Sequence, residues 1–319
     1  MNPIVKGKNG ITAQVVQASR SPGGKTIYTL NISYGLLIHG EFLRHRLFSN
    51  SVKSQRAIPM KVLRKEVLKN PYVPVWLGKH QKGMVADQDV SNTRVAALLW
   101  KSSRYPACFA HWIAEKVGAH KEWANRLLNP WQFVSQTVTF TEGDNFFTLR
   151  LHRDAQKDIQ EVAKCMKKAM ESCEVIEIGN GEWHAPYVTR QRGSDGFLRY
   201  FDNDGISLTL EQALKASAAR VARSSYNNHD KSDACYANDE KLYKMLIESK
   251  PSHASPVESQ ATPLAIPKIH KFTNLSVEKA MGQQGATHID SKGNVWSGNL
   301  MGWCQARQTL DDHCDWGQS

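Results

Sequence analysis

The chain has 319 residues, of which 41% are hydrophobic and 22% are charged, and its formal net charge is +11 at pH 7. This balance excludes a disordered chain, and the length is enough to bury a substantial core. No stretch approaches the roughly 18 apolar residues of a membrane span, and the first ten residues lack the apolar core of a secretion signal. We therefore expect a cytoplasmic protein whose positive charge attracts anions, either nucleic acid or small phosphorylated ligands.

The six cysteines include no C-x-x-C pair. Zinc sites usually show paired ligand spacing, so the sequence predicts no metal site. Without an export signal, reduced thiols are the simplest interpretation.

The first half of the chain predicts two strands followed by helices. Residues 11–16 are typical of a strand, 21–24 of a turn, and 26–34 alternate between apolar and polar side chains, which predicts a half-buried strand. Residues 36–47 lose this alternation and favour a helix, so that residues 44–56 would form a helix end and a loop. Further helices are expected within 58–87 and at 92–103, 107–128 and 155–172, the last one with an apolar stripe.

The second half contains a candidate internal boundary and two further helices. Residues 190–205 favour a loop and make the best boundary. Thr209 and Gln212 form a T-x-x-Q capping box that opens a helix reaching about Arg223, and residues 239–249 favour another helix. The last 50 residues are rich in Gly, Asn and Ser. Within them, residues 295–310 favour a packing helix, although Trp303 and Arg307 could line a site.

Residues 44–56, RHRLFSNSVKSQR, combine five basic side chains with three serines. A solvated basic helix end, favoured by the helix dipole, would explain the charge. A phosphate site would also explain the serines, because arginine forks bind phosphate oxygens in pairs and hydroxyls fill the remaining acceptor positions.

Within this segment, Arg44-His45-Arg46 and Ser54 form the pattern R-H-R-x7-S, which resembles the signature of the flavin-dependent thymidylate synthase (ThyX) family. Three other blocks resemble the same family. NFFTLRLHRDAQ at 145–156 resembles N-F-L-x-L-R-x-x-x-x-A-Q, AARVARSSY at 218–226 resembles A-A-R-V-S-Y, and HASPVES at 253–259 resembles H-x-S/T-P-F-E-H. Residues 125–130, NRLLNP, are similar to the family's arginine a few residues before a proline.

The order of the blocks differs from the usual family order. The A-A-R-V and H-A-S-P blocks follow R-H-R here, whereas they precede it in the family, so the chain resembles a circularly permuted member. Chain termini are often close together, and such a rearrangement can keep the fold. The resemblance implies an α+β fold with an antiparallel sheet packed against long helices. Residues 1–319 would form a single domain in which the segments 1–190 and 206–319 build one site.

The resemblance implies methylation of C5 of dUMP to give dTMP. Methylenetetrahydrofolate would supply the carbon, and NADPH would reduce a bound FAD that supplies the hydride. It also implies a homotetramer whose sites are shared between subunits. A permuted, divergent member would suit a virus of bacteria that makes its own DNA precursors.

The resemblance assigns roles to individual residues. Arg150 falls on the arginine that favours the ionised N3 of the pyrimidine, because a fixed cation stabilises negative charge as it develops. The other substrate-binding candidates are Arg44, Ser54, Arg56, Arg126 and Glu41. The cofactor-binding candidates are Arg44, His45, Arg46, Asn145, Ser255, His253 and Ser225. Arg223 is expected to be structural.

Four positions depart from the family pattern and leave the substrate open. Glu41 replaces a glutamine, Val52 a glutamate, Asp154 a histidine, and Ser259 the last histidine of H-x-S-P-F-E-H. UMP or another pyrimidine nucleotide, hydroxymethylation at C5, and modification of uracil in a nucleic acid remain alternatives. A non-enzymatic basic binding protein ranks lowest, since the sequence contains no nucleic-acid module and no array of aromatic and basic residues.

Overall fold

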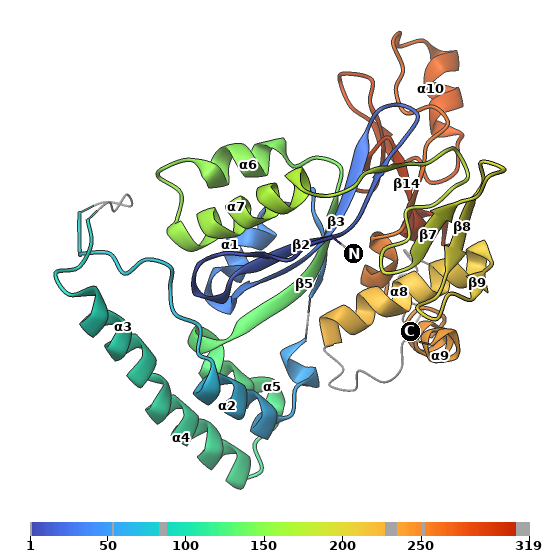
Figure 1. The fold of residues 1–319 in the computed structure, drawn as a ribbon. Helices are drawn as coiled ribbons and strands as arrows, with labels where there is room; N and C mark the ends of the chain where they lie inside the picture. The colour runs from blue at the N-terminus through green and yellow to red at the C-terminus, as the bar shows by residue number, and fades with distance from the viewer. Residues whose placement is uncertain (1, 53, 83–87, 227–234, 250–252, 311–319) are drawn as a thin grey trace.

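An antiparallel sheet forms the centre of the structure, which is a computed structural model describing residues 2–52, 54–82, 88–226, 235–249 and 253–310 (Figure 1). Its strands run in the order β1-β2-β3-β5-β4, and β6 pairs in parallel with β2. The strands are β1 (Val5–Lys6), β2 (Thr12–Arg20), β3 (Thr26–Gly35), β4 (Ser49–Val52), β5 (Phe133–Phe140) and β6 (Ile176–Glu177). The α+β class predicted from the sequence is confirmed.

One face of this sheet is apolar and carries the main core. The register of β3 against β5 pairs Tyr28 with Phe140 and Leu30 with Val138, so their side chains point to the same side. Helix α7 (Lys157–Glu171) covers this face, with α6 (Asp144–Leu151) beside it (Figure 1). The predicted amphipathic helix at 155–172 is confirmed, because its apolar stripe is buried against the sheet.

The opposite side, here called the polar face of the sheet, carries hydroxyl and amide side chains. It consists of Thr12, Gln14, Gln17, Ser19, Thr29, Asn31, Ser33, Ser49, Ser51, Ser135, Thr137 and Thr139. The alternation predicted for residues 26–34 is confirmed, since Thr29, Asn31 and Ser33 lie on this face and Tyr28, Leu30, Ile32 and Tyr34 lie on the other. Buried hydroxyl groups need hydrogen-bond partners, so this face requires a polar cover.

The segment between β3 and β5 departs from two predictions. A 3-10 turn η2 (Leu36–Ile38) leads into α1 (His39–Leu43), which ends before Arg44. The helix expected over 36–47 is therefore wrong in extent, and part of the loop expected in 44–56 is β4, because pairing with β5 draws residues 49–52 into the sheet. The next elements are the turn η3 (Gln55–Ala57) and helix α2 (Met60–Lys69), which fits the short helix expected within 58–87.

Two helices extend from the body as an arm: α3 (Thr93–Ser102) and α4 (Arg104–Lys116) (Figure 1). Helix α3 confirms the prediction at 92–103. The single helix expected at 107–128 is wrong, because Gly118 with a φ of +77° ends the helical stretch. A short helix α5 (Lys121–Ala124) and a 3-10 segment η4 (Asn125–Trp131) follow.

A hairpin replaces the loop predicted at 190–205, so that prediction is wrong. A small sheet is formed by strands β7 (Thr189–Arg192), β8 (Leu198–Phe201) and β9 (Ser207–Leu208). The carboxylate of Glu182 links β7 to β8, because it accepts hydrogen bonds from the Arg192 side chain and from the backbone N–H of Leu198. The capping box is confirmed: Gln212 N donates to Thr209 Oγ1 at 3.2 Å, and Thr209 N donates to Gln212 Oε1 at 2.9 Å. It opens α8 (Leu210–Tyr226), and α9 (Tyr236–Leu246) follows.

The last described part of the chain is built from short strands. Its elements are η5 (Ser255–Glu258), β10 (Ala261–Pro263), α10 (Asn274–Met281), β11 (His288–Ile289), β12 (Val295–Ser297), β13 (Leu300–Met301), β14 (Trp303–Gln305) and η6 (Ala306–Thr309), while η1 (Lys8–Gly10) lies near the N-terminus. The packing helix expected at 295–310 is wrong. Gly298 and Gly302 adopt positive φ and turn the chain between strands, which a helix does not permit.

Two findings bear on the environment of the protein. Among the helices that the structure describes, none is long and apolar enough to span a bilayer. The described cysteines, Cys108, Cys165, Cys173, Cys235 and Cys304, are free thiols.

Candidate functional site

His45 and Arg150 meet although 105 residues separate them in the chain. His45 follows α1 in a tight turn, where its backbone N–H donates to Phe42 O at 3.2 Å. Arg150 lies in the last turn of α6, and its Nε donates to Nε2 of His45 at 2.9 Å. The imidazole packs edge-on against Phe146 at 4.7 Å between ring centroids, so α6 supplies two contacts of the histidine, and the ring of Phe48 lies 6.0 Å away.

Burial and the contact with Arg150 both favour the neutral form of His45. Burial, together with the nearby Arg150 cation, lowers the pKa of His45 below its ordinary value. The imidazole is therefore neutral at pH 7, and since Nε2 accepts from Arg150, the proton sits on Nδ1. The terminal nitrogens of Arg150 make no hydrogen bond with another described residue, so they remain available to a ligand.

Three further candidates lie exposed around this pair. Arg44 and Arg46 flank His45, and within the described part of the chain neither forms an ion pair. Asn145 is exposed in the first turn of α6. Unpaired guanidinium groups on a turn are free to bind an anion in two-pronged fashion.

The loop that carries Ser54 and Arg56 docks against η4. Gln55, which lies between Ser54 and Arg56 in the sequence, donates a hydrogen bond to Asn129 Oδ1 at 2.8 Å. The side chain of Asn125 donates to the backbone carbonyl of Gln55 at 3.0 Å. Arg56 is exposed and lies 3.7 Å from Glu122, a weak surface pair. Arg126 follows Asn125 directly and is exposed. The N-R-L-L-N-P block and the S-x-R segment therefore lie together.

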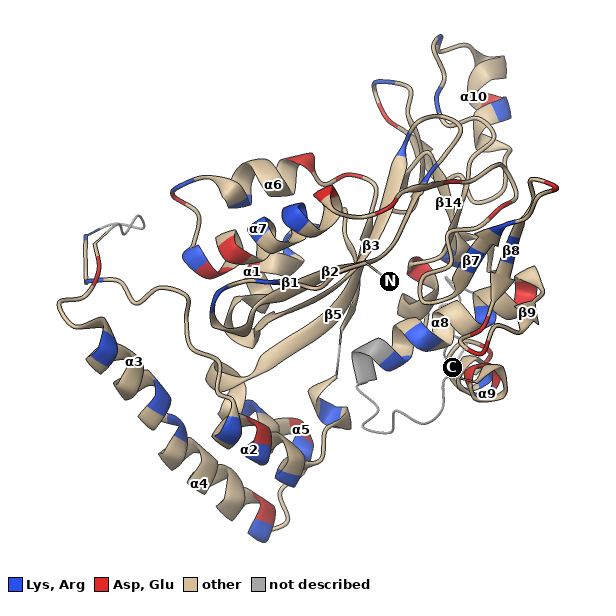
Figure 2. Cartoon of the chain, viewed as in Figure 1, with Lys and Arg blue, Asp and Glu red and all other residues tan. Residues whose placement is uncertain are grey.

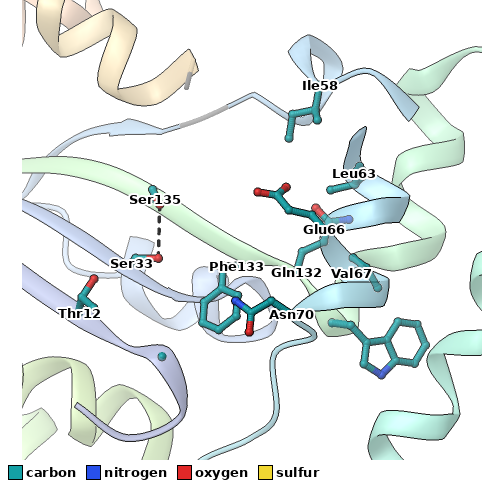
Figure 3. A pocket seen from close by; sticks show the side chains of 12 residues that line it. Thr12, Ser33, Ile58, Leu63, Glu66, Val67, Asn70, Gln132, Phe133 and Ser135 are labelled. Atoms are coloured by element: carbon teal, nitrogen blue, oxygen red, sulfur yellow. Dashed lines mark hydrogen bonds between the residues drawn. The ribbon is translucent and has the colours of Figure 1, made fainter. Parts of the chain in front are cut away.

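Two cavities open beside this loop. One of about 200 Å³ is lined by residues that include Val52, Gln55 and Asn129. The other, of about 310 Å³, lies against the polar face of the sheet, where Ser135 donates to Ser33 at 3.3 Å (Figure 3). Glu66 and Asn70 of α2 also line this second cavity. The sequence did not identify it, because its polar residues come from four distant segments with no shared motif.

The last strand brings the H-A-S-P block to the R-H-R segment. Gln305 Nε2 donates to Ser49 Oγ at 3.1 Å and to Glu258 O at 2.9 Å. Asn299 accepts from Ser49 at 3.0 Å and donates to Leu47 O at 3.2 Å. Neither Gln305 nor Asn299 was predicted as a site residue, since nothing in the local sequence marks them as partners of residues 47–49.

Within the H-A-S-P block, the side chains divide between surface and interior. His253 and Ser255 are exposed, whereas Ser259 is buried. Glu258 forms an ion pair with Arg307, and burial raises the pKa of this carboxyl although Arg307 opposes the rise. Arg307 thus contacts the H-A-S-P block, which fits the alternative from the sequence that Arg307 lines a site. Trp303, the other residue of that alternative, is fully buried and donates to Lys25 O at 3.2 Å.

The residues that depart from the family pattern have different environments. Glu41 is partly buried, and its Oε2 atom is inaccessible and has no hydrogen-bond partner. Val52 packs against the main core. Asp154 is exposed beside His152 and Arg153. Glu41 is therefore the departure that leaves a polar atom unsatisfied, which is unfavourable unless a ligand or another group supplies a donor.

The A-A-R-V block lies on α8. Arg223 shares the buried carboxylate of Asp239 with Arg220, which agrees with the structural role expected for it. The side chain of Ser225 lies outside the described residues. Among the side chains that are described, no group of three or more His, Cys, Asp or Glu could hold a metal ion.

Comparison with known proteins identifies the family. A family model described as thymidylate synthase complementing protein matches residues 11–173, just over half of the chain. No curated protein matches the sequence. Among solved structures, the UMP/dUMP methylase PolB from Streptomyces cacaoi bound with 5-Br UMP is 18% identical with a TM-score of 0.41, covering 53% of this chain and 96% of that chain. The same enzyme bound with 5-Br dUMP is 17% identical with a TM-score of 0.41, covering 52% of this chain and 92% of that chain. Since the family match spans both the R-H-R and the N-F-F-T-L-R blocks, the chain belongs to the thymidylate synthase complementing protein family.

Proposed function

We propose that this protein methylates C5 of dUMP to give dTMP, with methylenetetrahydrofolate as carbon donor and NADPH as reductant. The observation that carries the proposal is the hydrogen bond from Arg150 to His45, which joins the two family blocks within residues 11–173. Neither block has a reason to meet the other in a protein that only binds anions at its surface.

Arg150 is the proposed catalytic residue. Its Nε is held by His45, so the planar guanidinium has a defined orientation, and its terminal N–H groups can face the pyrimidine. There they would stabilise the negative charge that develops on N3 and on the neighbouring carbonyl oxygen as C5 becomes nucleophilic. Because His45 is neutral, it orients Arg150 without neutralising it.

The nucleotide phosphate is assigned to Ser54, Arg56 and Arg126. These residues lie on the two segments that Gln55 and Asn125 hold together beside the cavity of about 200 Å³. Arg56 forms an ion pair with Glu122, with 3.7 Å between the guanidinium and the carboxylate, and both side chains are largely exposed to solvent. Such a pair is weak, so a phosphate can replace Glu122 as the partner of Arg56. Arg44 would lie between the nucleotide and the cofactor.

The residues assigned to FAD suit an anionic dinucleotide. Arg44 and Arg46 present two exposed guanidinium groups on one turn, and His45 adds a neutral imidazole whose Nδ1–H can donate. Asn145, Ser255 and His253 are exposed and can donate further hydrogen bonds, and Ser225 completes the assignment. When bound, FAD would supply to the nucleotide the hydride that it takes from NADPH.

We further propose that residues 1–319 form one domain in which the family blocks occur in permuted order. The support is the set of contacts between the segments 1–190 and 206–319. Gln305 reaches Ser49, and helix α8 lies beside β4 and β5. A site that needs both segments would lose its geometry if they were separated.

A homotetramer with shared sites is the proposed assembly. The arm of α3 and α4 exposes large apolar side chains: Leu98 is 66% exposed, Leu99 64%, Phe109 63% and Val117 75%. Contiguous apolar surface of this kind usually marks a protein interface. Figure 2 shows Lys and Arg spread over α2, α3, α4, α7 and α8 and not gathered on one element, a distribution that does not favour a nucleic-acid partner.

UMP is the second candidate substrate, and Glu41 favours it. The Oε2 atom of Glu41 is an acceptor without a partner among the described residues. A sugar hydroxyl would satisfy it if nucleotide binding opens this buried position, and ribose has one hydroxyl more than deoxyribose. A glutamate in place of the family's glutamine thus suits contact with the ribose of a ribonucleotide. It does not suit contact with the phosphate, because two negative charges repel each other.

Two measurements test the function. The purified protein should bind FAD, and the flavin absorbance should bleach with NADPH in the absence of oxygen. Tritium release from C5-labelled dUMP, UMP and dCMP then identifies the substrate, with dUMP expected to give the highest rate. A protein that binds no FAD and releases no tritium from any of the three nucleotides would overturn the proposal.

A further inference from the structure

A separate cavity of about 610 Å³ lies between β2, the start of β7 and helix α8. We call it the β2–β7 cavity, and its lining includes Gln14, Val16, Gln17, Tyr187, Arg190 and Arg223. It opens onto the polar face of the sheet, whereas α6 and α7 cover the other face (Figure 1). None of the residues assigned above to nucleotide or FAD lines it.

Arg190 is the distinctive residue of this cavity. Its Nη1 donates to Ser19 Oγ at 2.7 Å and its Nη2 to Ala18 O at 3.2 Å, while the buried Nε atom has no hydrogen-bond partner among the described residues. Within the described part of the chain, no carboxylate lies within ion-pair distance of this guanidinium. A partly buried arginine is costly unless an anion accompanies it, so the second N–H groups of Nη1 and Nη2 favour an anionic ligand in the cavity.

A hydrogen-bonded chain holds Arg190 in place. Ser19 accepts from Arg190, so its single hydroxyl hydrogen points to Nδ1 of His184 at 2.7 Å. His184 then donates from Nε2 to Thr29 at 2.8 Å, and Thr29 can donate to Thr139 at 2.8 Å. Complete burial keeps the pKa of His184 well below its ordinary value. This chain is neutral throughout, so it positions the guanidinium without compensating its charge.

The other charged groups around the cavity leave it positive. Arg220 and Arg223 share one carboxylate, Asp239, and Glu174 is the remaining acidic residue of the lining. Burial lowers the pKa of Arg190 to about 10, which still leaves it charged at pH 7. Glu182 also lies near Arg190, but it forms an ion pair with Arg192. Among the described residues, four guanidinium groups (Arg190, Arg192, Arg220 and Arg223) thus accompany three carboxylates (Glu174, Glu182 and Asp239), and Arg190 lines the cavity without an ion pair.

The remaining lining suits an organic group attached to the anion. Val16 and Val188 provide apolar contacts, and Gln14 and Asn203 provide amides. Tyr187 adopts a φ of +66°, a strained value for a tyrosine, and its carbonyl accepts from Arg220 at 2.8 Å. The volume lies in the range usual for pockets that enclose small ligands.

We propose that the β2–β7 cavity binds a small phosphomonoester, with Arg190 as the anchor of the phosphate and the apolar wall against the organic part. A phosphate is favoured over a carboxylate because its oxygens point in several directions and can accept from more than one of the surrounding guanidinium and amide groups. The site is independent of the proposed methylation.

Calorimetric titration of the full chain with ribose 5-phosphate tests this proposal. The Arg190→Gln variant removes the anchor, and Arg199→Gln, an exposed β8 residue paired with Asp195, is the control with the same change of charge. Arg56→Gln shows whether the phosphate instead binds at the proposed nucleotide site. Val16→Glu places a carboxylate in the cavity without removing a hydrogen bond, which keeps the test valid if Arg190→Gln does not fold.

We expect saturable binding that weakens by about tenfold or more in Arg190→Gln and Val16→Glu, since a charge-assisted pair is lost or opposed. Binding should stay unchanged in Arg199→Gln and Arg56→Gln. The proposal is overturned if ribose 5-phosphate does not bind, if Arg56→Gln removes the binding, or if Val16→Glu leaves it intact. A parallel titration with inorganic phosphate measures the contribution of the organic part. If inorganic phosphate bound as tightly as ribose 5-phosphate, the proposed role of the apolar wall would be contradicted.

Discussion

Gln305 donates a hydrogen bond of 3.1 Å to Ser49, a residue 256 positions earlier in the chain. The same amide reaches the backbone carbonyl of Glu258 at 2.9 Å. One buried side chain therefore ties the last strand to both the R-H-R segment and the H-A-S-P block, and the geometry of the proposed site depends on it.

Replacing this amide should destabilise the protein. In Gln305→Leu the hydroxyl of Ser49 and the carbonyl of Glu258 lose a buried donor, and we expect a loss of about 1–3 kcal/mol in the free energy of unfolding. Urea unfolding of the two proteins measures it. Gln308→Leu, in the 3-10 turn η6 that directly follows β14 and partly exposed, is the matched control and should change stability little. Equal stability of Gln305→Leu and the wild type would show that the amide does not hold the segments together.

Arg150 should be required for turnover and not for folding. Arg150→Lys keeps the charge but removes the fork that both binds His45 and faces the pyrimidine, so tritium release should fall by about 100-fold or more. Flavin absorbance should persist, because Arg44 and Arg46 are unchanged. Arg153→Lys, on the exposed turn that follows α6, should behave as wild type. Retention of full turnover in Arg150→Lys would exclude the proposed activation.

Acid should destabilise the protein in a defined pH range. Burial lowers the pKa of His39, His45, His111 and His184, so the folded state binds fewer protons than the unfolded chain. The stability that neutral histidines contribute is complete above the unfolded pKa of about 6.5 and is lost as the pH falls through the lower folded values. The free energy of unfolding should therefore decrease between about pH 7 and about pH 5.

A substitution at His184 separates this effect from general acid unfolding. His184→Gln can accept from Ser19 and donate to Thr29 but does not titrate, so its stability should depend less on pH than that of the wild type. His288→Gln, on an exposed strand, should retain the wild-type dependence. Parallel curves for the wild type and His184→Gln would mean that this histidine does not contribute.

The exposed arm should mediate assembly. Light scattering should give the wild type a mass well above the 35.9 kDa of one chain. The double variant Leu98→Glu with Phe109→Glu places charges in the apolar surface and should shift the mass towards one chain, together with a loss of activity if the sites are shared. Phe197→Glu, at an exposed turn between β7 and β8, is the control. A monomeric wild type would contradict the proposed assembly.

Several parts of the fold follow from local patterns. The alternation in 26–34, the apolar stripe of α7 and the Thr209–Gln212 capping box each predict an element that the structure contains. These features arise from interactions between residues close in sequence, so the sequence carries them without reference to the rest of the chain.

Other parts depend on partners that are distant in sequence. Residues 49–52 form a strand because β5 is there to pair with them, and residues 190–205 form a hairpin around Glu182. Residues 49–52 are mostly polar, and residues 190–205 are rich in polar residues and glycine, which is typical of loops. The pairing energy comes from residues that no local window contains, and this is why both segments were predicted wrongly.

The same division applies to the sites. The motifs R-H-R-x7-S and N-F-F-T-L-R by themselves determined the family and named Arg150 and His45, because short motifs record which chemical groups are needed. Only the tertiary structure decided that these two residues touch, that Gln305 joins three segments, and that Arg190 lies in a recess with no described carboxylate within ion-pair distance. Each of these facts is a contact between side chains brought together by the sheet and its two faces, and such contacts leave no periodic or spaced signal in the sequence.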